Sequence, residues 1–290
     1  MKIDTILLVL LPVFLCFGPQ FAKLNESPEN IVFQTKDKEI LEQIFDTFND
    51  DKNTPVSNLI IKVGAFFKET PYKAATLDIN PNDEKLIVNL REMDCTTFAE
   101  NVLAISRTIK SGNPTFEKFT AELQNIRYHD GKIDGYTSRI HYFSDWIFEN
   151  DRREVVESVS KEIGGTIYPK LINFMSTHPD SYRQLKGNPE NQNAIVTREK
   201  EISARKTYFI PEEKVGEIEA KLKVGDIVGI TSRVEGLDVS HVGILIRKDG
   251  RIHLMHASTT AKKVIVSNET LEEYLLKSKS VTGIMVARPR

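Results

Sequence analysis

The sequence is poor in cysteine, with Cys16 and Cys95 alone among 290 residues. If Cys16 leaves with an export signal, the mature chain keeps one thiol and forms no internal disulfide. A single thiol outside the cytoplasm indicates either a reactive group or a small buried side chain. An excess of charge is also missing, because the formal net charge is −2. This balance excludes the basic footprint of a nucleic-acid-binding protein.

A hydrophobic run long enough to cross a bilayer is absent too. The apolar stretch at residues 6–17 is shorter than a membrane-spanning helix requires and has the length of a signal-peptide core. We therefore expect a signal peptide over residues 1–22, a linker over 23–35 and a single domain over 36–290, exported to the periplasm or cell envelope. Two alternatives stay open: a lipid anchor on Cys16, the one route to membrane association, and a buried N-terminal helix.

What is present is the composition of a globular protein, with 40% hydrophobic and 28% charged residues. Helical periodicity comes first along the chain and strand-like alternation comes last. Helices are expected at 36–50, 56–67, 94–110 and 116–126, strands at 227–230, 242–246, 252–257 and 281–287, and irregular structure with short helices at 176–206. This order predicts an α+β fold with segregated layers.

Cys95 lies where the helix predicted over 94–110 begins. Unpaired backbone N–H groups and the macrodipole at a helix N-terminus lower the pKa of a thiol. The same N–H groups can receive a developing oxyanion, and Asp94 is the expected N-cap. These features predict a nucleophile, against the alternative of a small buried residue on a core helix.

Two histidines far along the chain, His241 and His256, are brought together by a predicted hairpin. The Asp-Gly pair at 249–250 is a strong turn signal between two apolar runs. Because side chains alternate along strands, His241 and His256 project from one face and His253 from the other. We therefore expect His241 to be the base for Cys95 and His256 to orient its ring.

Two other interpretations of the histidines compete with this one. His253 and His256 could be metal ligands, but on a strand their spacing splits them between faces, and no second cysteine or acidic cluster completes a zinc site. Alternatively, the histidines are ordinary surface residues of a hairpin. We expect no metal and no cofactor.

These motifs resemble a known family. Residues 94–98 (DCTTF) are similar to the nucleophile motif of NlpC-type cell-wall cysteine peptidases, and residues 240–244 (SHVGI) and 256–258 (HAS) to their histidine motif and third catalytic position. The stretch 128–146 resembles one branch, associated with N-acetylmuramoyl-L-alanine amidase activity on peptidoglycan fragments. The resemblance implies a papain-like fold, in which the cysteine helix packs on a small antiparallel sheet, with extra helices at the N-terminus and in the middle.

The resemblance also implies a substrate and a bond. The bond joins N-acetylmuramic acid to L-alanine in muropeptides, which are the expected partners; no protein partner is predicted. Related enzymes more often cut D-glutamyl–diaminopimelate linkages, so an endopeptidase is the main alternative. A non-catalytic envelope binding module and transfer of the acyl group to an amine stay open as well.

Muropeptides carry sugar faces, carboxylates and amides, and the polar aromatic middle stretch has side chains that suit them. Arg139 is the expected ligand of a carboxylate or sugar oxygen, and Tyr128 the expected donor to the reacting carbonyl. Each has a structural role as its alternative, and Trp146 and Phe148 are expected in the core. The predicted substrate-binding residues are Asp94, Tyr128, Arg139, His141, Tyr142 and Ser240.

Overall fold

The computed structural model describes residues 30–79 and 83–290. The chain divides into the segment Met1–Asn30 and one compact unit over Ile31–Arg290. The predicted signal peptide and most of the predicted linker lie outside the described residues. Within the described ranges, no helix is both long enough and apolar enough to cross a membrane.

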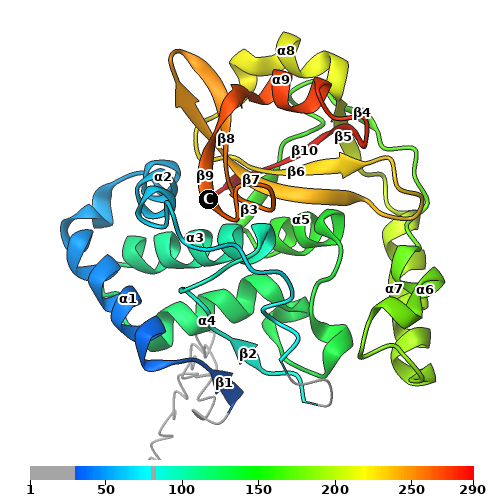
Figure 1. Cartoon of the computed structure of the whole chain (residues 1–290), viewed down its shortest axis with the longest axis horizontal. Coiled ribbons are helices and arrows are strands. Elements are labelled where there is room, and N and C mark those ends of the chain that lie inside the picture. Colours follow the sequence, from blue (N-terminus) through cyan, green and yellow to red (C-terminus); the bar gives the residue numbers. More distant parts are fainter. Residues whose placement is uncertain (1–29, 80–82) are drawn as a thin grey trace, which may run out of the picture. The chain divides into compact units, whose positions relative to one another are not determined.

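The first half of the unit is helical, as the periodicity predicts. Its helices are α1 (Thr35–Thr47), α2 (Val56–Phe66), α3 (Cys95–Lys110), α4 (Phe116–Arg127) and α5 (Phe143–Arg152). α3 is buried along most of its length and packs against α2, α4 and the sheet (Figure 1). Two short strands, β1 (Ile31–Val32) and β2 (Leu86–Ile87), pair in parallel, so the described end of the expected linker belongs to the fold.

The second half forms an antiparallel sheet with the strand order β4-β5-β10-β6-β7-β8-β9, and β3 pairs with β10. The strands are β3 (Val156–Ser158), β4 (Thr166–Ile167), β5 (Tyr208–Pro211), β6 (Ile227–Ser232), β7 (Val239–Lys248), β8 (Arg251–Ser258), β9 (Lys263–Thr270) and β10 (Val281–Pro289). The four predicted strands correspond to β6, β7, β8 and β10, and the α+β class is as predicted. β9 was not predicted.

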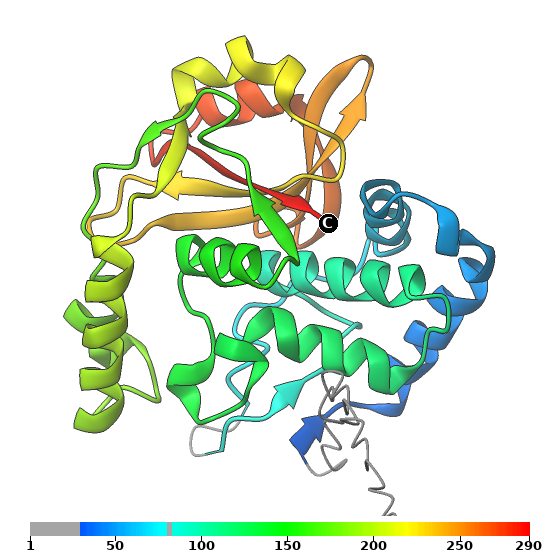
Figure 2. The ribbon, with the colours of Figure 1, turned by 180° about the vertical axis from the view of Figure 1, so that it is seen from behind.

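The central strands are buried on both faces, and successive residues alternate between two hydrophobic clusters. Ile244 and Met255 pack with the large helical layer, whereas Leu245 and Leu254 pack with α8 (Val215–Ile218) and α9 (Leu271–Leu276). Figure 2 shows α8 and α9 on the side of the sheet away from α3 and α5. The sheet therefore lies between a thick helical layer and a thin one. Cys95 comes from the thick layer, whereas His241 and His256 have the same parity along their strands as Leu245 and Leu254.

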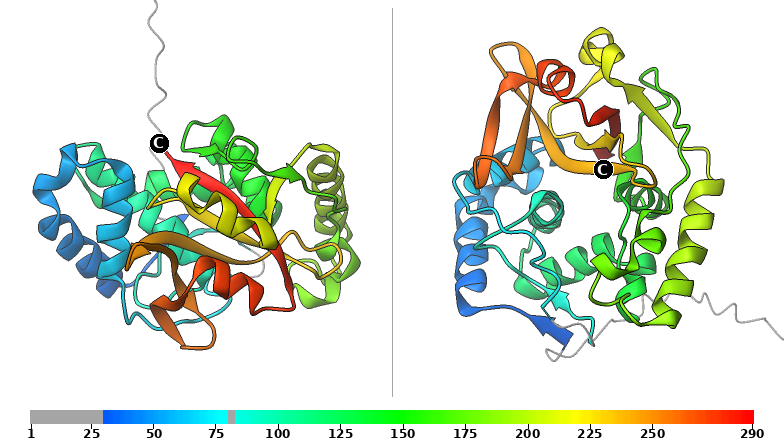
Figure 3. Two further views of the ribbon diagram at one scale, coloured as in Figure 1. Left: turned by 90° about the horizontal axis from the view of Figure 1, so that it is seen from above. Right: turned by 45° about the vertical axis from the view of Figure 1, so that its right-hand side comes forward.

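α6 (Phe174–Thr177) and α7 (Pro189–Ala204) stand together at one side of the unit (Figure 3). The prediction of irregular structure with short helices is wrong here, because α7 has 16 residues. The Asn188 side chain caps its start by accepting from the Asn191 N–H, and Pro189 occupies the first turn.

Candidate active site

The first residue of α3 is Cys95, and Asp94 fixes the turn that carries it. The Asp94 carboxylate accepts a hydrogen bond from the Thr97 backbone N–H at 2.8 Å, and the Thr97 hydroxyl accepts one from the Asp94 N–H at 3.0 Å. This reciprocal capping box satisfies two N–H groups at the helix start. The predicted cap is present, and the Asp94 carboxylate is engaged within the helix.

The hairpin of β7 and β8 has the predicted turn and register. Its turn residues, 249–250, have positive φ angles of 50° and 82°, as a tight hairpin turn requires. Nε2 of His241 lies 2.6 Å from Nδ1 of His256, whereas His253 hydrogen-bonds the backbone of β9 from the opposite face. Because His256 occupies Nε2, the second nitrogen of His241, Nδ1, is the one left for a reacting partner.

Cys95 and His241 line the same cavity, which has a volume of about 110 Å³. α3 supplies Cys95 and Thr96, β7 supplies His241, and the start of α5 and the loop before β7 close the space. The other lining residues are Ile140, His141, Tyr142, Phe143, Trp146, Leu237, Asp238, Val239, Ser240 and Val242. The sulfur and the imidazole that the sequence predicts to react together therefore face one small space.

The loop before β7 is a fixed wall of this cavity. Both carboxylate oxygens of the buried Asp238 accept backbone N–H bonds of 2.7 Å, one from Ser144 in the first turn of α5 and one from Val239. Nearby, the Lys170 ammonium donates to the carbonyls of Ser232 and Leu237. The wall next to Cys95 is thus tied to the helical layer by a buried acid, whose pKa burial raises.

The protonation state of the pair differs from the expectation that the helix end would lower the thiol pKa. Burial, and then the Asp94 carboxylate, raise the pKa of Cys95 to about 11, although hydrogen bonds from Val242 and Thr96 act in the opposite direction. Burial, followed by the neighbouring His256, lowers the pKa of His241 to about 3. The resting site therefore holds a neutral thiol and a neutral imidazole.

Tyr128 and Arg139, which are predicted to contact substrate, do not line the cavity that holds Cys95. The Tyr128 hydroxyl donates to the Glu84 carboxylate at 2.8 Å. The Arg139 guanidinium donates to Asp78 at 2.8 Å and lies 3.5 Å from Glu84. Both side chains are buried and are engaged by carboxylates of the chain itself.

Of the other predicted substrate contacts, His141, Tyr142 and Ser240 line the cavity, whereas Asp94 does not. Nε2 of His141 lies 3.0 Å from the Tyr136 carbonyl, and burial lowers the His141 pKa to about 3. The Tyr142 hydroxyl points away, donating to the Glu199 carboxylate at 2.7 Å. Nε2 of His141 and the hydroxyl of Tyr142 are thus engaged by other groups of the chain. Ser240 is exposed at its rim.

Two tyrosines near Cys95 were not predicted. Burial raises the pKa of Tyr72 and Tyr274, and the charge of a Cys95 thiolate raises both further, so both rings lie within electrostatic range of the sulfur. The Tyr72 backbone pairs with Met93 in an isolated bridge, and no sequence spacing relates the two. Tyr274 lies in the short helix α9, whose position depends on the β9 strand that was not predicted.

A larger cavity, of about 550 Å³, adjoins the first. Ser240 and His241 line both cavities. The larger one continues over His256 and Tyr274, whose rings meet edge to face with 5.7 Å between centroids. His241 therefore stands at the junction of a small cavity beside the sulfur and a large one beyond the histidine pair.

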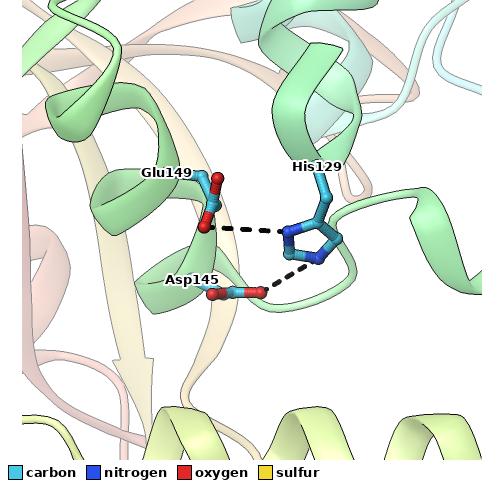
Figure 4. A group of neighbouring side chains, drawn as sticks. All are labelled: His129, Asp145 and Glu149. Atoms are coloured by element: carbon cyan, nitrogen blue, oxygen red, sulfur yellow. Dashed lines mark ion pairs between the residues drawn. The ribbon is translucent and has the colours of Figure 1, made fainter. Parts of the chain in front are cut away.

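A buried group elsewhere has the residue types of a metal site: His129, Asp145 and Glu149 (Figure 4). Nε2 of His129 lies 3.3 Å from Asp145, and Nδ1 lies 3.9 Å from Glu149. The other oxygen of each carboxylate pairs with an arginine, Arg205 on Asp145 and Arg152 on Glu149. Because the ring turns a different nitrogen to each carboxylate, the group is arranged as an imidazole between two acids, and one metal ion could reach only one of the nitrogens.

Comparison with known proteins relates most of the chain to one family. Residues 62–284 match the AmiA-like family, described as N-acetylmuramoyl-L-alanine amidase-like. The structure of an N-acetylmuramoyl-L-alanine amidase from Bacteroides uniformis is 38% identical in sequence, with a TM-score of 0.77 over 81% of this chain and 99% of that one. A Bacteroides fragilis protein described provisionally as a xylanase is 42% identical, with a TM-score of 0.75 over 78% and 99%.

A more distant structure shares the fold. Protein LPG0564 from Legionella pneumophila, of family DUF1460, is 21% identical, with a TM-score of 0.67 over 87% of this chain and 94% of that one. A search of curated protein sequences found no match.

Proposed function

Because the chain belongs to the AmiA-like family, whose members are N-acetylmuramoyl-L-alanine amidase-like, we propose that it is a cysteine amidase of peptidoglycan fragments. It cleaves the bond between N-acetylmuramic acid and L-alanine. The observation that carries the proposal is geometric: Cys95 and His241 line one cavity, and His256 lies 2.6 Å from the far nitrogen of His241. The name of the Bacteroides uniformis relative supports the choice of bond.

The reaction starts from the neutral pair. As the Cys95 sulfur attacks the amide carbonyl carbon, its proton passes to Nδ1 of His241, and His256 holds the imidazolium that forms. The hydrogen bonds from Thr96 and Val242 that favour a charged sulfur stabilise the charge that develops during attack. His241 then gives the proton to the leaving nitrogen, the C–N bond breaks, and water hydrolyses the thioester, which restores the thiol.

The proposal extends to the wider relationship and the compartment. A helix that begins with the nucleophile and packs on β7 and β8 supports membership of the NlpC-type, papain-like superfamily. Peptidoglycan fragments as substrate support export to the periplasm or envelope. Lipid anchoring at Cys16 stays a second possibility for how the protein is held there.

A glycosidase is a second candidate because of the relative described as a xylanase. Glycosidases of the common kind need two carboxyl groups facing the scissile bond. Among the described residues that line the cavity of Cys95, Asp238 is the one acid, and backbone N–H groups occupy both of its oxygens. The residues present therefore support thiol chemistry.

The test is turnover of a defined muropeptide. Cys95→Ala should lower kcat/KM by about 10⁴-fold or more, and His241→Gln nearly as much, because both act in one proton-transfer unit. The matched control is His178→Gln, which changes an exposed histidine directly after α6 and should retain activity. Full activity of the folded Cys95→Ala protein would overturn the mechanism.

Product analysis by mass spectrometry decides the bond. Two separate products are expected: an intact peptide with a free alanine amine, and the sugar with a free lactyl carboxylate. A released dipeptide would instead identify a D-glutamyl endopeptidase, and capture of the acyl group by an added amine would identify a transferase. Binding of the muropeptide without any product would point to an envelope binding module.

A further inference from the structure

The large cavity lies on the histidine side of the reacting atoms. Its wall includes His241 and His256, but Cys95 lines only the small cavity. The volumes differ fivefold, about 550 against about 110 Å³. The acyl part and the amine part of a substrate, which the scissile amide joins, therefore face cavities of different size.

The chemistry of the reaction decides which part goes where. The acyl part stays bonded to the sulfur, whereas the leaving nitrogen must come within hydrogen-bond reach of the imidazole that protonates it. His256 occupies Nε2 of His241, so Nδ1 serves both the sulfur and the leaving nitrogen. A leaving group that continues past His241 enters the large cavity.

The lining of the large cavity suits a peptide with a carboxylate. Several hydroxyl and amide residues line it, among them Ser258, Thr259 and Asn268, and groups of this kind can pair with peptide groups. One ammonium and one carboxylate line it, Lys277 and Glu269, and these lie 2.7 Å apart. The Lys277 side chain is 74% exposed, so this pair is weak and a ligand carboxylate can replace Glu269 on the lysine.

We propose that the large cavity binds the leaving peptide of the substrate, with Lys277 as the ligand of a peptide carboxylate and Tyr274 as the floor beside His256. The assignment of the leaving side rests on the proposed function. The ligand class is an acidic peptide with a free N-terminal amine, and the sugar remains on the side of Cys95. Lys277 and Tyr274 then determine which stem peptides are accepted.

The experiment measures binding to the Cys95→Ala protein by calorimetry, so that no turnover interferes. The probes are L-alanyl-D-glutamate, the same dipeptide with both glutamate carboxylates amidated, and N-acetylmuramic acid. In the Cys95→Ala background, Lys277→Gln should lower the affinity for the acidic dipeptide about fivefold, which is the effect expected for a partly exposed ion pair. The amidated dipeptide should bind equally well with and without Lys277.

Two further variants sharpen the result. Lys36→Gln removes a similarly exposed lysine–glutamate pair on α1 and should change the affinity for neither dipeptide. Tyr274→Ala should lower the affinity for both dipeptides, because the ring that forms the floor of the cavity is lost. The proposal would be overturned if the dipeptides do not bind, or if their affinity is the same with and without Lys277 and Tyr274. It would also be overturned if these two residues determine the affinity for N-acetylmuramic acid.

Failure of this proposal and failure of the proposed function give different results. If the wild-type protein hydrolyses no muropeptide while binding of the acidic dipeptide still depends on Lys277, the cavity is a peptide site and the amidase assignment is wrong. If the wild-type protein releases the peptide while binding ignores Lys277 and Tyr274, the amidase assignment stands and the peptide site is wrong.

Discussion

At the scale of single residues, the central point is the proton on Cys95. The sulfur stands at a helix N-terminus, yet burial and the Asp94 carboxylate hold its pKa at about 11. Burial holds the pKa of His241 at about 3, so the imidazole does not take the proton in the resting protein. Attack and proton transfer must then occur together, in contrast to enzymes that store a thiolate–imidazolium pair.

We predict that the ultraviolet absorbance of the thiolate is absent at neutral pH and rises only above about pH 10. The measurement is the difference between the protein and its Cys95→Ser variant across a pH titration. Asp94→Asn keeps a good N-cap but removes a negative charge beside the sulfur, so it should move the rise to lower pH. Thiolate absorbance already present at about pH 6 would show a stored ion pair instead.

The catalytic candidates could be found from sequence because their logic is local. Alternation along the hairpin is enough to pair His241 with His256 and to exclude His253, and the structure has this arrangement. The substrate contacts are harder to predict. An arginine looks the same in sequence whether its partner is a ligand carboxylate or, as for Arg139, the distant Asp78 of the same chain.

At the scale of elements, the cavity depends on a close approach between β6 and α5. A Cβ at Gly229 would lie 2.3 Å from the Phe143 ring at the start of α5. That ring stacks on Trp146 at 5.2 Å, and both line the cavity of Cys95. The missing side chain at Gly229 therefore lets α5 pack against the sheet with its first turn facing the sulfur.

We predict that Gly229→Ala lowers the free energy of unfolding by about 1–3 kcal/mol, the usual cost of overpacking, and lowers kcat/KM by displacing Phe143. Urea unfolding and muropeptide turnover measure the two effects. Phe143→Leu should open space for the new methyl group, so the double variant should be less destabilised than the sum of the single changes. Strict additivity would show that the methyl group is accommodated elsewhere.

The helices with a clear apolar stripe and the strands of the central sheet could be predicted from sequence. α7 could not, because only Ile195, Glu199 and Ile202 are buried along it, which is too thin a stripe to indicate an amphipathic helix. β9 is only partly buried, and its residues alternate weakly. Phe148 was expected in the core and is instead 43% exposed, with the Arg205 guanidinium 3.8 Å from its ring centroid.

At the scale of the whole described unit, the helical layer is held by charge as well as by apolar packing. Two ion pairs join α3 and α4, with the arginine on α4 in one pair and on α3 in the other. Arg127 of α4 donates to Glu100 of α3 at 2.7 Å, fully buried, and also to the Ile87 carbonyl of β2. Arg107 of α3 pairs with Glu122 of α4 at 3.0 Å and is partly exposed. The two pairs form a matched comparison of a buried and a partly exposed ion pair.

We predict that Arg127→Met costs about 3–5 kcal/mol of unfolding free energy, because it leaves Glu100 buried without a partner. Arg107→Met should cost about 1 kcal/mol or less. Burial already raises the pKa of Glu100 above its ordinary 4.5, against the lowering effect of Arg127. Without the arginine the folded carboxyl should hold its proton to a higher pH.

The sign of the pH dependence follows from this raised pKa. Above about pH 4.5 the unfolded carboxyl has lost its proton while the folded one keeps it, so folding stability falls as pH rises through that window. The loss caused by Arg127→Met should therefore be smaller at about pH 5 than at about pH 8 in urea unfolding. Adding Glu100→Gln should remove most of this difference. A loss that is equal at both pH values would mean that water reaches Glu100 once Arg127 is gone, and that this part of the helical layer is less tightly sealed than its burial indicates.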